Sequence, residues 1–290
     1  MIIQVLIGGL MLGGIYALIA LGYSLIYKAS GLLTFVQGEF FMLGAFLGLT
    51  FYEFWKIPFI VSFFIVTLIM FFFGFMVEKI IITPMLEKKA KKIYIVLATI
   101  GLSITLRNVA MLIWGSTNLY FPPIFNVGIL DIHGYKVAPE ALLIIVISLF
   151  TMSALHFFMN RTNLGISMKA AAQNELAAKA LGINVSFTRG ITWGLSAALS
   201  SIGGILFAPM FSASVTMGVF PGLMGFASAI VGGYGNMYGA MIGGLLMGFI
   251  QTFSGAFISS LFKNFIGFVI LILVLFIKPS GILNEEAVED

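Results

Sequence analysis

Residues 4–27 read QVLIGGLMLGGIYALIALGYSLIY and carry no charged side chain. An α-helix needs about 20 predominantly apolar residues to cross the hydrocarbon core of a bilayer. No cluster of basic residues precedes this stretch, so we expect a retained first span and not a cleaved signal peptide. The stretch therefore predicts a membrane-spanning helix at the start of the chain.

The rest of the chain has the same apolar character. Of its 290 residues 60% are hydrophobic and 9% are charged, and its mean hydropathy is +1.12, whereas a soluble domain has roughly 25% charged residues. Together the observations predict an all-α, polytopic integral membrane bundle with eight or nine spans in a single domain, residues 1–290. The run at 223–236 is short enough to be re-entrant. The apolar runs are 4–27, 38–55, 57–78, 93–114, 138–159, 188–210, 223–236, 239–260 and 264–278.

The basic residues predict the orientation of the spans. If the spans alternate, eleven of the 15 Lys and Arg fall on one side, three on the other, and Arg107 within a span. Cytoplasmic loops are enriched in Lys and Arg. We therefore expect a protein of the cell's cytoplasmic membrane with its N-terminus on the outer side and its acidic tail, NEEAVED, on the cytoplasmic side. The eleven are Lys28, Lys79, Lys88, Lys89, Lys91, Lys92, Arg161, Lys169, Lys179, Arg189 and Lys278; the three are Lys56, Lys136 and Lys263.

Two segments have a similar build and suggest an inverted repeat. Residues 31–48 and 222–244 each combine an apolar start, a polar interruption and a helix rich in small residues. Interrupted helices in repeated halves are common near the transport path of transporters. We therefore take Thr34, Gln37 and Glu39 as candidate path residues or as a structural clamp, with Phe226 and Ser228 in the second segment. Alternatively, Glu39 caps the next helix at the membrane interface.

Two further features favour structural explanations. Gly235, Gly239 and Gly243 repeat every fourth residue, as do Gly244 and Gly248, a spacing that lets helix backbones approach closely. We prefer helix packing over a contribution of bare backbone to a substrate passage. For Arg107 we prefer an ion pair with Glu39 or Glu53, or snorkelling to an interface, over direct contact with a substrate.

Residues 162–185, TNLGISMKAAAQNELAAKALGINV, form a polar, alanine-rich segment between spans. Thr162 or Asn163 can cap a helix, Met168–Leu181 are strong helix formers, and Gly182 is a natural stop. An amphipathic helix of this kind could rest on anionic membrane lipid. Its mild charge and alanine-rich face favour insertion into a groove of a partner protein instead.

The chain lacks the motifs of an enzyme. It has no cysteine, only two isolated histidines, and no GxxxxGK[ST] loop that could hold nucleotide phosphates. Neither a metal site nor a cofactor is indicated, and the net charge of +4 does not suggest nucleic acid. If ATP drives transport here, another polypeptide must hydrolyse it.

Several blocks of the chain resemble the smaller, H-type permease of ATP-binding-cassette (ABC) importers for branched-chain amino acids. GLLTFVQGEFFMLGAF matches the family pattern G-[VL]-[IL]-N-F-A-H-G-E-x-x-M-L-G-A. Thr34 and Gln37 depart from that pattern, and Lys169 stands where the family usually has arginine. The other matching blocks are GGIYALIALGYSLIY, ATIGLSITLRN, residues 162–185, GFASAIVGGYGNMYGAMIGGLLMGF and LILVLFIKPSGIL.

The resemblance implies a fold of inverted, interrupted helices and a set of partners. These are a second homologous permease, two ABC ATPase subunits and an extracytoplasmic solute-binding protein. It also implies import of branched-chain or other hydrophobic amino acids; a permease for urea or short-chain amides, or a motor-independent channel or carrier, is the alternative. The residues expected to dock in the ATPase groove are Gly165, Lys169, Ala171, Gln173, Glu175, Gly182 and Ile183.

Overall fold

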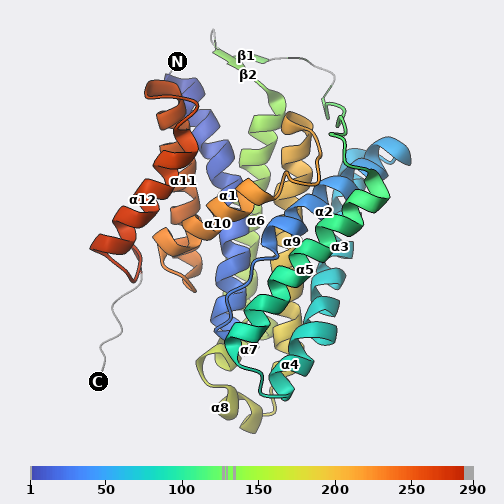
Figure 1. Ribbon diagram of the computed structural model, residues 1–290, viewed down its shortest axis with the longest axis vertical. Coiled ribbons are helices and arrows are strands. Elements are labelled where there is room, and N and C mark those ends of the chain that lie inside the picture. The colour runs from blue at the N-terminus through green and yellow to red at the C-terminus, as the bar shows by residue number, and fades with distance from the viewer. Residues whose placement is uncertain (1, 126–127, 129, 133–134, 284–290) are drawn as a thin grey trace.

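The computed structural model describes residues 2–125, 128, 130–132 and 135–283, and it is almost entirely helical (Figure 1). His133 and the acidic tail lie outside these residues. The elements are α1 (Ile2–Ser30), α2 (Gln37–Leu49), the π-helical turn η1 (Thr50–Phe54), α3 (Phe59–Val77), the π-helical turn η2 (Glu78–Ile82), α4 (Thr83–Glu87), α5 (Lys92–Trp114), β1 (Leu130–Ile132), β2 (Tyr135–Val137), α6 (Pro139–Arg161), α7 (Asn163–Gln173), α8 (Glu175–Ala180), α9 (Val185–Phe211), α10 (Val219–Gly232), α11 (Met237–Phe257) and α12 (Lys263–Ile277).

Each of the nine expected apolar runs falls on a helix, which confirms the polytopic helical bundle. Within the described residues, six helical stretches are long and apolar enough to cross a membrane, and α10 and α12 are shorter apolar helices. The helix α2 continues through η1 to Phe54. The third expected run is longer than predicted, because η2 and α4 carry it to Glu87. One short antiparallel hairpin, β1–β2, interrupts the all-α plan, with Leu130 opposite Val137.

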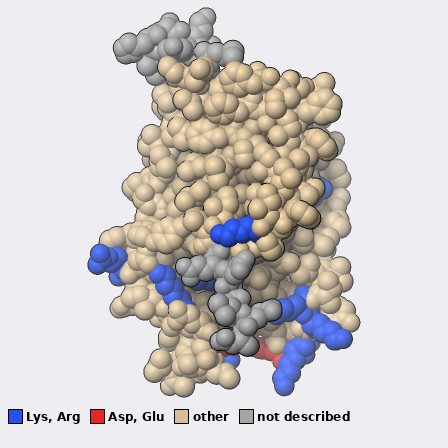
Figure 2. Space-filling model, turned by 90° about the vertical axis from the view of Figure 1, so that its left-hand side faces the viewer, with Lys and Arg blue, Asp and Glu red and all other residues tan. Residues whose placement is uncertain are grey.

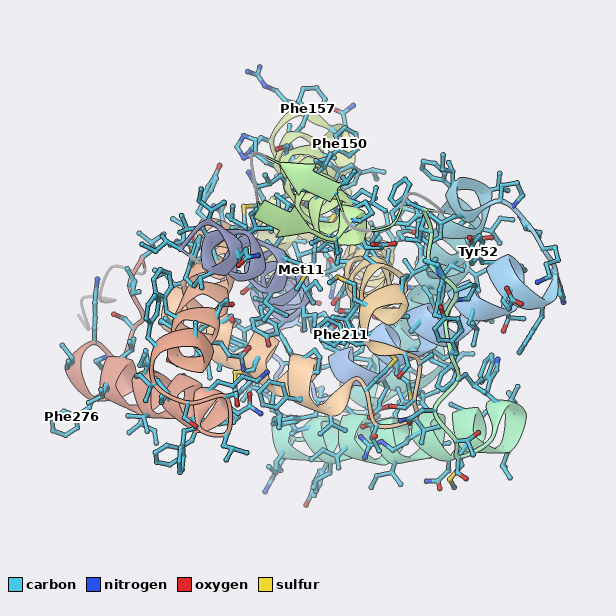
Figure 3. All side chains as sticks on the ribbon, turned by 90° about the horizontal axis from the view of Figure 1, so that it is seen from above. Met11, Tyr52, Phe150, Phe157, Phe211 and Phe276 are labelled. Atoms are coloured by element: carbon cyan, nitrogen blue, oxygen red, sulfur yellow. The ribbon has the colours of Figure 1, made fainter. Side chains whose placement is uncertain are left out.

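The centre of the bundle is built around α1 and α9. More than half of the apolar window of α1 (56%) and most of that of α9 (72%) is buried, against 28% for α3, α5 and α6. The two central helices run in opposite directions in Figure 1. The peripheral helices present apolar side chains to the outside, as Phe150, Phe157 and Phe276 do in Figure 3. In a bilayer these side chains would meet lipid, so the protein does not need to bury them.

The helices α2 and α10 are both interrupted, and their N-terminal ends meet. Each helix follows a non-helical or irregular segment, 31–36 before α2 and 212–218 before α10. In Figure 1, α2 rises from the centre and α10 descends from it, as in two inverted halves. The two ends touch through backbone: a Cβ atom on Gly38 would lie 2.5 Å from the carbonyl oxygen of Gly218. Only glycine permits this approach, so the two half-length helices can meet inside the bundle.

The two ends of the bundle differ in charge. We call the end that carries α4, α7 and α8 the basic end, and the end that carries β1–β2 the hairpin end (Figure 1). On the face shown in Figure 2, the Lys and Arg side chains gather toward the basic end, while the part near the hairpin end is almost bare of charge. The distribution is the one that alternating spans predict.

Candidate functional site

A cleft with a charged pair in its wall opens where the N-terminal ends of α2 and α10 meet. Its volume is about 140 Å³. The charged groups in it come from α2 and α5: Arg107 Nη2 lies 2.5 Å from Glu39 Oε1, and Ser103 Oγ donates to the same oxygen at 2.9 Å. The cleft is lined by Tyr23, Phe35, Gly38, Glu39, Ser103, Arg107, Gly218, Val219, Gly222 and Leu223.

The charges of this cleft are unequally exposed. The side chain of Glu39 is 4% exposed, whereas that of Arg107 is 36% exposed. The Nε atom of Arg107 is buried and has no hydrogen-bond partner among the described residues. The guanidinium thus neutralises Glu39 with one nitrogen and keeps a donor unused. A partly open arginine with spare donors can donate hydrogen bonds to a second anionic or carbonyl group.

The structure selects among the explanations of Glu39 and Arg107. Glu39 lies in the first turn of α2, but its side chain makes no capping hydrogen bond to that helix. Its carboxylate instead bonds across to α5 through Arg107 and Ser103. Of the arrangements expected for Arg107, the structure therefore contains the ion pair with Glu39. Glu53 pairs with Lys56 near the hairpin end.

The five candidate path residues do not all lie at the cleft. Glu39 lines it, and the ring of Phe226 packs against Tyr23 and Phe35 in its wall. Thr34 is buried, with its hydroxyl unpartnered among the described residues.

Gln37 and Ser228 face neighbouring helices. The Gln37 amide nitrogen donates to Ser196 Oγ, and its oxygen accepts from Ser200 Oγ at 2.5 Å, so both atoms are bound to α9. Ser228 Oγ donates to the carbonyl of Met224 within α10, and the backbone of Ser228 packs against Gly243. Gln37 therefore joins α2 to α9 and leaves no amide group for the cleft.

Among the cleft residues that sequence reasoning did not single out are Ser103, Gly218 and Gly222. Ser103 precedes Arg107 by four residues on α5, so the two share a helix face, and this spacing could have indicated it. Nothing in the sequence near Gly218 and Gly222 indicates that they meet Gly38, because the partners lie about 180 residues apart in the chain.

The repeated glycines of α11 form two separate contacts. A Cβ on Gly239 or Gly243 would collide with the backbone of α10, while one on Gly244 or Gly248 would collide with the backbone of α1. Two adjacent small-residue faces thus hold α11 against two helices at once. Gly235 departs from the prediction: it lies in the turn before α11 with φ +90°, near the ring of Tyr27.

The segment 162–185 differs from the single helix that its composition predicted. It forms α7 and α8, and the chain breaks at Asn174, whose φ and ψ are −151° and 106°. Asn174 Oδ1 accepts the backbone N–H of Ala177 and so caps α8. Asparagine is a better cap than a helix-interior residue, which explains the break. Thr162 caps α7 by accepting from Gly165 N, and Gly182 ends the helical part with φ +82°.

The expected docking residues are spread over both faces of this segment. Gly165 is buried, and a Cβ there would lie 2.3 Å from the carbonyl of Phe158. Lys169 bonds to Asn160 of α6. Ala171 is partly exposed on α7, and Gln173 is exposed at its end.

At the other end of the segment, Glu175 and Ile183 line a cleft of about 470 Å³ between α4, α8 and α9, together with Arg189. Lys179 Nζ lies 2.7 Å from Glu175 Oε1. The hydrogen bond from Lys179 lowers the pKa of the Glu175 carboxyl, and the positive charges of Lys179 and Arg189 act in the same direction. This cleft is open and polar on the basic end.

A buried ion cluster connects α3 to the start of α9. Glu78 is fully buried in η2; its Oε1 accepts from Thr83 Oγ1 at 2.6 Å and from Arg189 Nε at 3.2 Å. Lys79 Nζ lies 3.5 Å from Glu78 Oε2 and donates to the carbonyl of Ser186 at 2.8 Å. Sequence reasoning missed this cluster because Glu78 stands at the end of an apolar run and Arg189 at the start of another.

The sequence model of a protein family described as the permease component of branched-chain amino acid transport systems matches residues 5–275. The chain belongs to this family. It is 29% identical to the high-affinity branched-chain amino acid transport permease LivH of Salmonella typhimurium, over 99% of this chain and 97% of that protein. No solved structure matches the chain.

Other relatives extend the likeness beyond enteric bacteria. BraD of Pseudomonas aeruginosa, a permease of the same description, is 30% identical over 99% of this chain and 97% of its own length. A probable LivH permease of Methanocaldococcus jannaschii is 26% identical over 96% and 91%. The resemblance seen in the sequence is thereby confirmed, and the chain is a transmembrane permease subunit of the ABC importer type.

Proposed function

We propose that this permease subunit carries branched-chain or other hydrophobic amino acids inward across the cytoplasmic membrane. Two separate ABC ATPase subunits supply the energy, a second homologous permease completes the membrane domain, and an extracytoplasmic binding protein delivers the cargo. The near full-length likeness to branched-chain amino acid permeases supports the cargo class. The single observation that carries the proposal is the charged, aromatic-walled cleft between the ends of α2 and α10.

The chemistry of the cleft suits a free amino acid. The N-terminal ends of helices carry partial positive charge, and half-helix ends in transporters face anionic substrate groups. The spare Arg107 donors add to this positive field, so the cleft favours a carboxylate. Glu39 offers a counter-charge for an ammonium group. The rings of Tyr23, Phe35 and Phe226 supply apolar surface for an aliphatic side chain.

The position of Arg107 also supports a second permease. Its side chain is 36% exposed, and α5 lies at the edge of the bundle (Figure 3). A charged side chain within a span is costly unless it faces protein or a water-filled cavity. We place the second permease against this edge, so that the two subunits enclose a shared passage.

The helix α9 is the proposed mechanical connection between the ATPase and the cleft. It follows the docking segment directly, and Arg189 fixes its first turns to Glu78. Further along, Ser196 and Ser200 hold Gln37, the first residue of α2. A movement of 162–185 would thus reach the N-terminal end of α2, where the cleft opens. This gives a two-state element that both nucleotide and cargo can bias.

The proposed orientation follows from the basic end. Cytoplasmic surfaces are rich in Lys and Arg, so the basic end faces the cytoplasm, where the ATPase subunits dock against α7 and α8. The start of α1 then lies outside, and the chain leaves α12 on the cytoplasmic side. Cysteine introduced beside α8 should react with a membrane-impermeant thiol reagent only in inside-out vesicles; labelling in right-side-out vesicles would reverse the orientation.

Transport is tested with the complete set of subunits in proteoliposomes. We expect uptake of labelled leucine that requires ATP and the binding protein, with little uptake of labelled urea. ATP-independent flux of solute through the purified chain alone would show a channel or carrier instead. A preference for urea or a short amide would overturn the cargo class and leave the importer mechanism standing.

The cleft is tested with Arg107→Gln. We expect leucine uptake to fall at least about tenfold, the equivalent of one charge-assisted hydrogen bond worth about 1.5–3 kcal/mol. The matched control is Asn108→Gln, because Asn108 is exposed on the same helix and bonds only to the carbonyl of Ile104 within it. Equal uptake by the two variants at equal expression would remove Arg107 from the path.

Docking is tested at Gly182. No atom would lie within 4 Å of a Cβ there, but the positive φ strains most side chains. Asparagine tolerates this conformation, so Gly182→Asn separates backbone strain from bulk. We expect Gly182→Trp to abolish uptake and substrate-stimulated ATPase activity while membrane insertion persists, and Gly182→Asn to keep most of both. Normal uptake by the Trp variant would refute the docking role.

A further inference from the structure

A small recess at the basic end gathers two lysines, and no acidic residue in the described part of the chain lines it. It has a volume of about 60 Å³ and lies between α1, α6, α7 and α11. A second, shallower hollow beside it is again lined by both Lys28 and Lys169. The recess is lined by Lys28, His156, Met159, Asn160, Lys169, Asn236, Met237, Tyr238 and Met241.

The polar side chains around the recess are already bonded to one another or to nearby backbone. Lys169 Nζ donates to Asn160 Oδ1, so the Asn160 amide must turn its nitrogen toward His156, 3.0 Å away. His156 Nδ1 then accepts, and it also lies 2.9 Å from the hydroxyl of Tyr238. Asn236 Oδ1 caps α11 by accepting from the backbone nitrogens of residues 238 and 239. Each side-chain acceptor described here is therefore already engaged.

The donors, in contrast, exceed what the recess can accept. An ammonium group has three N–H donors and no acceptor. Lys28 makes no hydrogen bond or ion pair with any other described residue, and Lys169 uses one donor on Asn160. Two like charges share one small space, a repulsive arrangement that an anion would relieve. The start of α11 beside them adds the partial positive charge of a helix N-terminus.

The recess also lies at the right depth for one class of anion. Lys28 stands in the last turn of the first span, so it is close to the level of the lipid headgroups at the basic end. Basic pockets between transmembrane helices on the cytoplasmic side are sites for anionic lipid headgroups. We propose that Lys28 and Lys169 bind a phosphate group here, supplied by the headgroup of an anionic phospholipid or by free phosphate.

The proposed site connects lipid to the docking segment. Lys169 belongs to α7, while Lys28 ends the central helix α1. A phosphate held by both would fasten α7 to the end of α1, next to the surface where an ATPase is proposed to dock. The binding itself does not depend on transport and can be measured without it.

The test is native mass spectrometry of the purified full-length chain in detergent with phosphatidylglycerol or phosphatidylcholine of the same acyl chains. We expect one phosphatidylglycerol to be retained under activation that removes phosphatidylcholine. Lys28→Gln should weaken its binding about fivefold, since one lysine near a membrane surface contributes about 1 kcal/mol. Lys28→Arg should keep the binding because it keeps the charge.

The matched control is Lys91→Gln, which removes an exposed lysine from the same end of the bundle but outside the recess. If inorganic phosphate displaces the lipid, the site also takes free phosphate; if it does not, the site requires the lipid headgroup. Equal retention of the two lipids with no effect of inorganic phosphate would overturn the proposal. So would equal losses in Lys28→Gln and Lys91→Gln.

Discussion

Removing the charge of Glu78 tests whether the buried cluster at the start of α9 is held by ion pairing. In Glu78→Gln the side chain keeps its size and an oxygen that can accept from Thr83 and Arg189. What disappears is the carboxylate that is ion-paired with Arg189, whose side chain is 12% exposed, and with Lys79, 3.5 Å away. Breaking a buried pair by removing one partner costs about 3–5 kcal/mol, because the remaining charge is left uncompensated.

The cluster also predicts an asymmetry. In Arg189→Gln the buried Glu78 still faces Lys79, so this variant should lose less stability than Glu78→Gln. In the double variant, which carries both substitutions, no buried charge lacks a partner. Its loss of folding stability should therefore be smaller than the sum of the losses in the two single variants. Neighbouring groups in one network typically couple by about 0.5–3 kcal/mol, and we expect the upper part of that range here because Glu78 is fully buried.

The assay measures the thermal stability of the purified chain in detergent as the fraction that remains folded after heating. At about 2–4 °C per kcal/mol, Glu78→Gln should lower the midpoint by roughly 6–20 °C. Glu53→Gln is the control, since the Glu53–Lys56 pair is exposed and such pairs contribute about 0–1 kcal/mol. A midpoint for Glu78→Gln within the range of the control, or strictly additive losses in the double variant, would refute the reasoning.

Three further predictions concern packing, the link to α9 and pH. Gly248→Ala places a methyl group 2.2 Å from the backbone nitrogen of Gly13 and should cost about 1–3 kcal/mol, whereas Gly101→Ala, with nothing within 4 Å, should be neutral or slightly stabilising; equal melting midpoints would contradict this. Gln37→Leu removes the amide that bonds to the hydroxyl groups of Ser196 and Ser200 on α9 and should cost about 1–3 kcal/mol of folding stability. Because the proposed connection between α9 and α2 is also lost, uptake should fall more than in an equally destabilised packing variant. An equal fall in both variants would leave Gln37 only a structural role. Because the pKa of Glu175 is lowered in the folded protein, its ionised carboxylate stabilises the fold at a pH above the pKa of the unfolded state, and this stabilisation is lost as pH falls through the pKa of the folded state. A carboxyl NMR titration should show that the pKa of Glu175 rises when Lys179 is replaced by Gln. No rise would exclude the Lys179 hydrogen bond as the main cause.

The helix pattern could be predicted well because the bilayer makes it a local property. A chain in hydrocarbon must satisfy its backbone hydrogen bonds within each span, so apolar run length alone indicates where helices lie. The same reasoning overlooked Asn174, where a side-chain cap competes with helix continuation. It also joined Gly235 to a stripe of glycines, although Gly235 belongs to a turn with positive φ.

The site was only half predictable. Glu39 and Arg107 attracted attention individually because charges within spans are rare, and their pairing was one of several options. The glycines at the meeting of α2 and α10 carried no local signal, and neither did the Glu78–Arg189 pair. Gln37 was expected beside the path, but its two serine partners on α9 turn it into a connection between helices.

The sequence by itself determined that this protein crosses a membrane many times, where its helices lie and which end is basic. These are consequences of the transfer of short segments between water and hydrocarbon, and each segment decides them alone. Tertiary structure decided which polar groups meet, because Glu39 and Arg107 are 68 residues apart and Glu78 and Arg189 are 111 apart. A buried charge is tolerated only when a partner reaches it, and whether one does depends on how whole helices pack.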